Sequence, residues 1–345
     1  MPEEGLSLDA ISVLTVWTAV AIYTLAFVAY AIDLARRSDQ SIKAKDAALE
    51  RELVAVGGSP IDALRAEEAL AADAISASPK ERPRFVWARI GTSLTVLGFL
   101  FHLAGTVLRG ISAERVPWSN MYEFALTGML LVVAVYLVTL FRYDLRFLGA
   151  FITGLTVVLL GGATLAFYVE VVPLADPLKS IWLVIHVFVA TLSSALFALA
   201  FGLSVMQLLQ ARRERLAVAA SATASDGRVV KTGPGFLRTL PSADALESLA
   251  YRFAIIGFIF WTFTLIAGAI WANDAWGRYW GFDTKEVWTF VIWVLYAGYI
   301  HARATRGWRG ARSAWLSIIG FSAVLFNFII VNQFFKGLHV YSGLS

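Results

Sequence analysis

The chain has 345 residues, of which 58% are hydrophobic and 16% charged, and its formal net charge is +4. With a mean hydropathy of +0.68, this composition is typical of a polytopic membrane protein; it excludes a soluble domain, and no nucleic-acid partner is expected. The chain contains no cysteine, which excludes disulfides, thiolate metal sites and an internal redox pair. The acidic N-terminus MPEEGLSLDA lacks the features of a cleavable signal peptide, so we expect none.

Eight apolar segments follow one another along the chain. Each is long enough to cross a hydrocarbon core of about 30 Å at a helical rise of about 1.5 Å per residue. They cover residues 10–33, 87–109, 118–141, 147–169, 178–209, 252–272, 286–304 and 314–335. We therefore expect an all-α polytopic membrane protein with about eight transmembrane helices, in a single transmembrane domain over residues 1–345.

Lysine and arginine are unevenly divided between the two sides that these spans separate. Of the 29 basic residues, 23 lie on the side that carries the connections 35–84, 142–146, 210–251 and 305–312. The positive-inside rule assigns this side to the cytoplasm, which places both termini and the connection before the seventh span outside. Residues 35–84 and 210–251 then become cytoplasmic linkers.

The third span begins with PWSNMYE, residues 117–123. Proline in the first turn and Ser or Asn at the cap are sufficient for a helix start. However, Glu123 would lie inside the outer leaflet, where an ionised carboxylate is costly and usually has a partner or a task. We therefore favour a functional role for Asn120 and Glu123 over capping alone.

A tryptophan-rich stretch, residues 271–288, connects the sixth and seventh spans with the sequence WANDAWGRYWGFDTKEVW. Enrichment of Trp at membrane interfaces explains the rings at its two ends, but it explains poorly the spacing of Trp276 and Trp280. Asp283 follows, and with Glu286 three residues later it forms a capping-box pattern for the next helix. An apolar, flat surface rimmed by charge suits a large planar ligand that carries carboxylates.

Four histidines, His102, His186, His301 and His339, lie within spans or at their ends. Neutral imidazole is a strong axial ligand of haem iron, and a six-coordinate haem needs two ligands. By depth, His186 and His339 belong to the outer side and could flank the Trp-rich stretch. His102 and His301 lie deeper, but their heights of about 20 Å and 5–10 Å above the inner face match less well.

The run from Trp276 to Glu286, Trp-Gly-x-x-Trp-x-Phe-Asp-x-Lys-Glu, resembles the WWD signature of haem-handling proteins of cytochrome c biogenesis. The resemblance is to the CcsA/ResC type, which is related to CcmC and CcmF, and PWSNMYE is similar to an element of the same branch. Phe282 stands where the signature usually has a second Trp. The resemblance implies an external His pair and a transmembrane His pair. We expect further haem contacts from Asn120, Glu123, Trp276, Arg278, Trp280, Phe282, Asp283 and Trp288.

The resemblance also implies a function. The chain would be a subunit of a cytochrome c haem lyase (synthetase) complex in a plasma or thylakoid-type membrane, with its active face extracytoplasmic. It would deliver haem b to the outer face and present it for covalent attachment to the CxxCH segment of apocytochrome c. A ResB-like membrane partner is implied, and the lipid bilayer is the surrounding medium.

Two other functions stay open. A di-haem, quinone-linked electron-transfer protein would usually pair histidines on one helix, whereas here each lies on a different span. A transporter of a non-haem anion would use the Trp-rich stretch as a gate and leave the histidines unexplained. Redox spectroscopy discriminates the first alternative, and purification with or without bound haem discriminates the second.

Overall fold

The computed structural model describes residues 6–57, 85–174, 176–222, 233–305, 307–335 and 337–338, with the backbone alone for residues 40–57, 177 and 220–222. These residues form helices and connections and contain no strand, so the predicted all-α class is confirmed. The long helices are α1 (Leu8–Gly57), α3 (Val86–Ala113), α4 (Met121–Leu140), α5 (Gly149–Ala166), α6 (Ile181–Ala222), α7 (Ala243–Trp276), α8 (Thr284–Thr305) and α9 (Ala311–Phe326). Shorter helical turns are η2 (Arg146–Leu148), η3 (Asp176–Lys179), η5 (Gly235–Thr239), η6 (Asn327–Val331) and α10 (Asn332–Phe334).

Each of the eight predicted spans coincides with one of these helices, but only seven are long and apolar enough to cross a membrane within the described ranges. The chain is thus a multi-pass membrane protein. The helix over the seventh predicted span, α8, falls short of the other seven in apolarity. Its sequence carries charges at Lys285, Glu286 and Arg303, and much of its bulk comes from Trp and Tyr rings.

The predicted linkers are more helical than expected. α1 continues beyond its apolar part to Gly57, α6 continues to Ala222, and α7 begins at Ala243. The extension of α1 is rich in Ala, Leu, Glu and Lys, which are strong helix formers and need no apolar neighbour. The first predicted linker, residues 35–84, therefore begins as a continuation of α1. The second, residues 210–251, begins as a continuation of α6 and ends as the start of α7.

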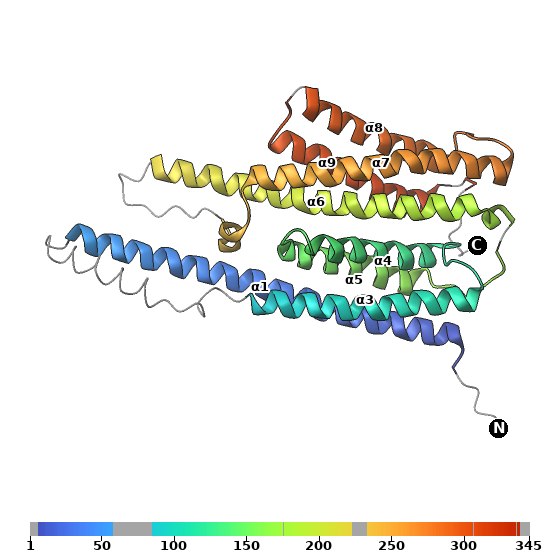
Figure 1. Cartoon of the computed structure of the whole chain (residues 1–345), viewed down its shortest axis with the longest axis horizontal. Helices are drawn as coiled ribbons and strands as arrows, with labels where there is room; N and C mark the ends of the chain where they lie inside the picture. Colours follow the sequence, from blue (N-terminus) through green and yellow to red (C-terminus); the bar gives the residue numbers. More distant parts are fainter. Residues whose placement is uncertain are drawn as a thin grey trace.

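The helices pack into two groups that meet at α4 and α6 (Figure 1). α1, α3, α4 and α5 form one group, and α6, α7, α8 and α9 form the other. The α3–α4, α5–α6 and α7–α8 connections share one end of the bundle, while the extensions of α1 and α6 project from the opposite end (Figure 1). The PWSNMYE run and the Trp-rich stretch therefore share an end, as predicted.

Close packing of α1 against α3 depends on glycines seven residues apart. A Cβ atom at Gly98 would lie 2.9 Å from the ring of Tyr23, and one at Gly105 would lie 2.7 Å from Val16. Small residues allow membrane helices to approach closely where burial of apolar surface gives no driving force. The matched positions are Gly91 with Tyr30, Gly98 with Tyr23, and Gly105 with Val16.

Candidate functional site

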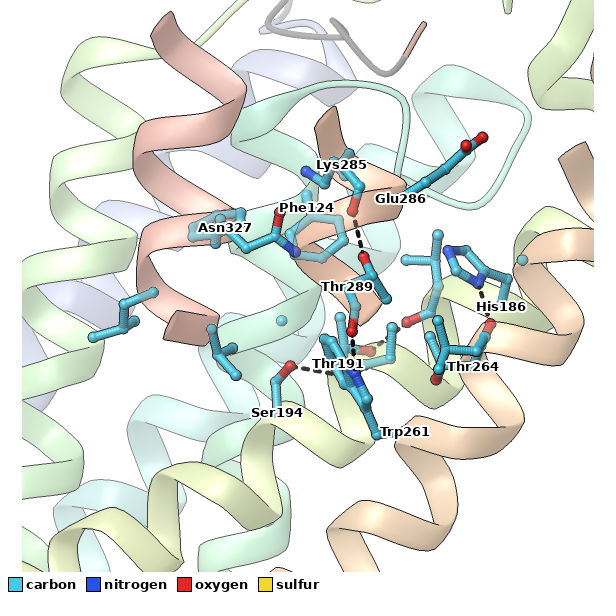
Figure 2. A pocket seen from close by; sticks show the side chains of 18 of the residues that line it. Phe124, His186, Thr191, Ser194, Trp261, Thr264, Lys285, Glu286, Thr289 and Asn327 are labelled. Atoms are coloured by element: carbon cyan, nitrogen blue, oxygen red, sulfur yellow. Dashed lines mark hydrogen bonds between the residues drawn. The ribbon is translucent and has the colours of Figure 1, made fainter. Parts of the chain in front are cut away.

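An elongated pocket opens beside the Trp-rich stretch and runs between α4, α6, α7, α8 and the end of α9 (Figure 2). Its empty volume, with the open mouth included, is ≈ 1300 Å³. The lining is mainly apolar and extends along α6 from His186 to Ala198, about 18 Å at the helical rise. Its polar lining residues are His186, Thr191, Ser194, Thr264, Lys285, Glu286, Thr289 and Asn327.

His186 is held in the pocket wall by contacts with α7. Its Nδ1 lies 2.9 Å from the carbonyl oxygen of Thr264. Because a carbonyl only accepts, Nδ1 carries the proton and the lone pair lies on Nε2. The imidazole also stacks on the indole of Trp271, with ring centroids 5.9 Å apart and planes 20° apart. Such second-shell support is typical of histidines that bind metals.

Gly268 makes this arrangement possible. A Cβ atom there would lie 2.7 Å from Cε1 and 2.8 Å from Nδ1 of His186. The imidazole therefore rests directly on the backbone of α7, and no residue larger than glycine fits without moving it. Neither Gly268 nor the Thr264 carbonyl could be identified from the sequence, because both act through contacts between two helices.

The Trp-rich stretch is half helix and half loop. α7 continues through Trp271 to Trp276 and ends at Gly277, whose φ of 69° lies in the left-handed region. Trp271 is buried, and its ring packs against that of Trp276 at 4.9 Å between centroids. The guanidinium of Arg278 lies 5.9 Å from the centre of the Trp276 ring. Only residues 277–283 form the loop itself.

This loop displays three aromatic rings, those of Tyr279, Trp280 and Phe282. Trp280 lines the pocket, and Phe282 is 80% exposed. Their ring planes are nearly perpendicular, at 87°, with centroids 6.1 Å apart. Phe282 has a φ of 58°, which is uncommon for a bulky residue and typical of functional sites. Trp288 does not belong to this display, since it packs on Phe326 of α9 at 4.4 Å.

The carboxylate of Glu286 fixes the backbone of the loop through hydrogen bonds. It accepts hydrogen bonds from the backbone N–H groups of Gly281 at 2.8 Å and Asp283 at 3.1 Å. The second bond is the returning arm of the predicted capping box. Arg278 approaches the same carboxylate at 3.5 Å. Asp283 accepts the N–H of Lys285 at 3.3 Å and that of Leu338 at 3.0 Å.

Asn120 and Glu123 lie at the same end of the bundle but not in the pocket lining. Asn120 is the N-cap of α4 and accepts the N–H of Glu123 at 2.9 Å. The fully buried Glu123 carboxylate binds Arg109 at 3.0 Å and Arg115 at 2.6 Å. Ser119 donates to it through both its N–H and its hydroxyl, each at 2.9 Å. Glu123 was expected to have a partner, and the structure provides two, Arg109 and Arg115.

The same network ties down the start of α1. Arg109 also binds Asp9 at 2.6 Å, and the hydroxyl of Tyr168, in the connection after α5, donates to Asp9 at 2.5 Å. Partial burial raises the pKa of Tyr168 to about 12, and the hydrogen bond to the Asp9 carboxylate acts in the same direction. The phenol is thus a neutral donor at physiological pH. This network joins α1, α3 and α4.

The structure does not bring His102 and His301 together. His102 is fully buried on α3, donates from Nε2 to the carbonyl of Leu126 at 2.8 Å, and accepts at Nδ1 from Tyr23 at 3.4 Å. His301 is exposed on α8, on the far side of the bundle from α3 (Figure 1). His339, the predicted partner of His186, lies outside the described residues.

A family model described as cytochrome C assembly protein matches residues 118–339. The chain belongs to the cytochrome c assembly protein family. The matched part contains the Trp-rich stretch, His186, His301 and His339, whereas His102 precedes it. The role of this family member therefore lies in cytochrome c biogenesis, as predicted.

Individual relatives agree. The chain is 35% identical over 249 residues to the cytochrome c biogenesis protein CcsA of Prochlorococcus marinus, covering 68% of this chain and 78% of the relative. It is 34% identical over 265 residues to CcsA of Guillardia theta, covering 74% and 86%. A solved structure of the cytochrome c haem lyase CcmF matches 95% of this chain and 48% of its own length, with a TM-score of 0.57 and 15% identity. The chain spans about half of that protein, and the likeness is one of fold.

Proposed function

We propose that this chain holds haem in the pocket beside the Trp-rich stretch and presents it for covalent attachment to apocytochrome c. One observation carries the proposal. In a member of the cytochrome c assembly family, His186 is fixed in the pocket wall with its lone pair on Nε2 and a stacked indole behind it. Haem is the cargo here, and imidazole is among its commonest axial ligands.

The apolar lining of the pocket and the charged side chains near it fit a haem. The apolar lining and the rings of Trp271 and Trp280 suit a porphyrin, and the cations Lys285 and Arg278 lie nearby for carboxylates. His339 is the proposed second axial ligand. Leu338, which precedes it in sequence, is bound to Asp283 at the edge of the loop. We propose no joint haem site for His102 and His301, because they lie on opposite sides of the bundle.

The geometry also supports a model of the attachment step, in which this chain holds the haem and the acceptor supplies the thiols. Phe282 is exposed on the loop that also contributes Trp280 to the pocket, and we propose that the vinyl groups of the haem meet two thiols of the apocytochrome at the open side of the pocket. Each thiol adds across a vinyl double bond: an S–C bond forms, the proton goes to the neighbouring carbon, and no electrons are exchanged overall. The thiols come from the acceptor, because this chain contains no cysteine.

Several features belong to the same proposal. The charge distribution favours an extracytoplasmic Trp-rich stretch and outer termini. Delivery of haem b from the inner side, a ResB-like partner and a plasma or thylakoid-type membrane also remain parts of it. The similarity to CcsA proteins supports the pathway.

The test is the absorption spectrum of the full chain purified in mild detergent from haem-replete cells. We expect a low-spin bis-imidazole spectrum that His186→Ala and His339→Ala weaken or shift, and that added imidazole restores. His301→Ala, at an exposed position outside the pocket, is the matched control and should leave the spectrum unchanged. A colourless wild-type protein, or haem lost in His301→Ala but kept in His186→Ala, would contradict the proposed site.

A further inference from the structure

Lys285 lines the pocket beside the loop, and its ammonium group is hydrogen-bonded to a neutral side chain. Its Nζ donates to the side-chain oxygen of Asn332. Among the described residues, no carboxylate forms a salt bridge with it. A cation in a largely apolar pocket is costly unless an anion is close. The Lys285 side chain therefore lacks a direct anionic partner among the described residues.

The two carboxylates that flank Lys285 in sequence form other hydrogen bonds. Glu286 accepts two backbone N–H groups and faces Arg278. Asp283 accepts the N–H groups of Lys285 and Leu338. Asp283 also attracts the Lys285 ammonium electrostatically, but no salt bridge joins them. Among the described residues, the ammonium therefore has no direct carboxylate partner, and an anionic ligand can supply one.

A second polar group points to the same place. Asn327 is 6% exposed, lines the pocket, and its Oδ1 has no hydrogen-bond partner among the described residues. Figure 2 shows its amide on the same side of the pocket as Lys285, next to the ring of Phe124. Half a turn of the amide exchanges donor and acceptor without changing its shape, so Asn327 can offer either to a ligand.

A local irregularity of the backbone places these groups. Asn327 opens the π-helical turn η6, and Asn332 follows its end. A π-turn inserts an extra residue into a helix and changes the direction of the side chains around it, often at functional sites. Here the same turn provides Asn327 to the pocket and Asn332 to Lys285.

We propose that Lys285 and Asn327 form a subsite for a carboxylate, and that this subsite receives one propionate of the haem. The inference rests on the proposed function and adds a recognition point to it. On binding, Nζ of Lys285 exchanges the amide oxygen of Asn332 for a carboxylate oxygen, a charge-assisted and therefore stronger hydrogen bond. With His186 at one point and the carboxylate at another, the haem would be held in one orientation in the pocket.

The test compares haem with haem dimethyl ester, in which both carboxylates are neutral, by absorbance titration of the full chain in detergent. The wild type should bind haem more tightly than the ester by roughly tenfold or more, as for hydrogen bonds to charged groups. Lys285→Met should abolish this preference and leave the position of the haem absorption band unchanged. Lys285→Arg should retain the preference. Lys179→Met, which alters an outer lysine paired with Asp176, is the matched control.

A second variant does not depend on removing the lysine. Asn327→Asp adds a negative charge to the subsite, so it should weaken the binding of haem and leave that of the ester unchanged. If Lys285→Met and Asn327→Asp both keep the wild-type preference for haem, the carboxylate subsite is disproved while haem binding stands. If the wild type binds neither porphyrin, the proposed function fails as well.

Discussion

Asp283 accepts the backbone N–H of Leu338 at 3.0 Å, which ties the chain after α10 to the loop between α7 and α8. The contact leaves no room for a side chain at the preceding position, since a Cβ atom at Gly337 would lie 2.1 Å from Oδ1 of Asp283. The Asp of the WWD-like run therefore acts on the segment that contains His339, in addition to starting α8.

This tether predicts that Gly337→Ala and Asp283→Ala loosen the proposed second axial ligand. We expect the haem affinity to fall by roughly tenfold, at the low end for changes in the outer shell of metal ligands. Titration with haem measures the effect, and added imidazole should recover the low-spin spectrum. Gly298→Ala is the matched control, because nothing lies within 4 Å of a Cβ atom at Gly298. Unchanged affinity in both tether variants would show that the tether does not position the ligand.

Gly268→Ala should displace His186, since the added methyl group would lie 2.7 Å from the imidazole. We expect haem affinity to fall roughly 10- to 100-fold, with a shifted absorption band and a protein that remains folded. Gly162→Ala on α5, where a Cβ meets nothing within 4 Å, should have no effect. A normal spectrum in Gly268→Ala would argue against His186 as the ligand.

Glu123→Gln should destabilise the protein rather than alter haem binding. It leaves the buried Arg109 and Arg115 with less negative charge, and breaking a buried ion pair typically costs about 3–5 kcal/mol. Thermal unfolding in detergent measures this loss. Asp144→Asn, which breaks the more exposed pair with Arg146, should change the free energy of unfolding by about 1 kcal/mol or less. A spectral change with unaltered stability would instead place Glu123 at the haem.

Gly98→Ala should separate α1 from α3, because the methyl group would meet the Tyr23 ring at 2.9 Å. Overpacking of this kind typically costs about 1–3 kcal/mol. The same unfolding assay checks the value. Gly98→Ala combined with Tyr23→Leu should recover part of the stability, whereas equal losses in the single and double variants would mean that the ring is not the obstacle.

Much of the fold follows from local sequence. Apolar runs of sufficient length predicted every membrane helix, and the Asp283–Glu286 spacing predicted the capping arm that the structure contains. The carboxylate of Glu123 was expected to have a partner because burial is costly, and it has two. The sixth predicted span ends at residue 272, whereas α7 continues to Trp276 and is followed by Gly277 in the left-handed conformation, which commonly ends helices.

The remaining features arise between segments that are distant in sequence. Several of these contacts are made by backbone atoms, so they cannot be predicted from the residue type. They involve the Thr264 carbonyl, the Gly268 backbone and the Leu338 N–H. From depth alone, His102 and His301 fitted a common haem less well than the outer pair did, and their helices lie on opposite sides of the bundle. Asn327 looked like an ordinary helix residue because the π-turn depends on how α9 packs.

The contact between the His186 imidazole and the backbone at Gly268 has a mechanical consequence. One carbonyl and one glycine of α7 hold the imidazole of α6, so the distance between these two helices near His186 sets the position of Nε2. A docking acceptor that pushed the two helices apart by a fraction of a hydrogen-bond length would release the ring from both supports at once. Loss of the proposed His186 ligand, and with it the release of the cargo, would then be coupled to the arrival of its recipient.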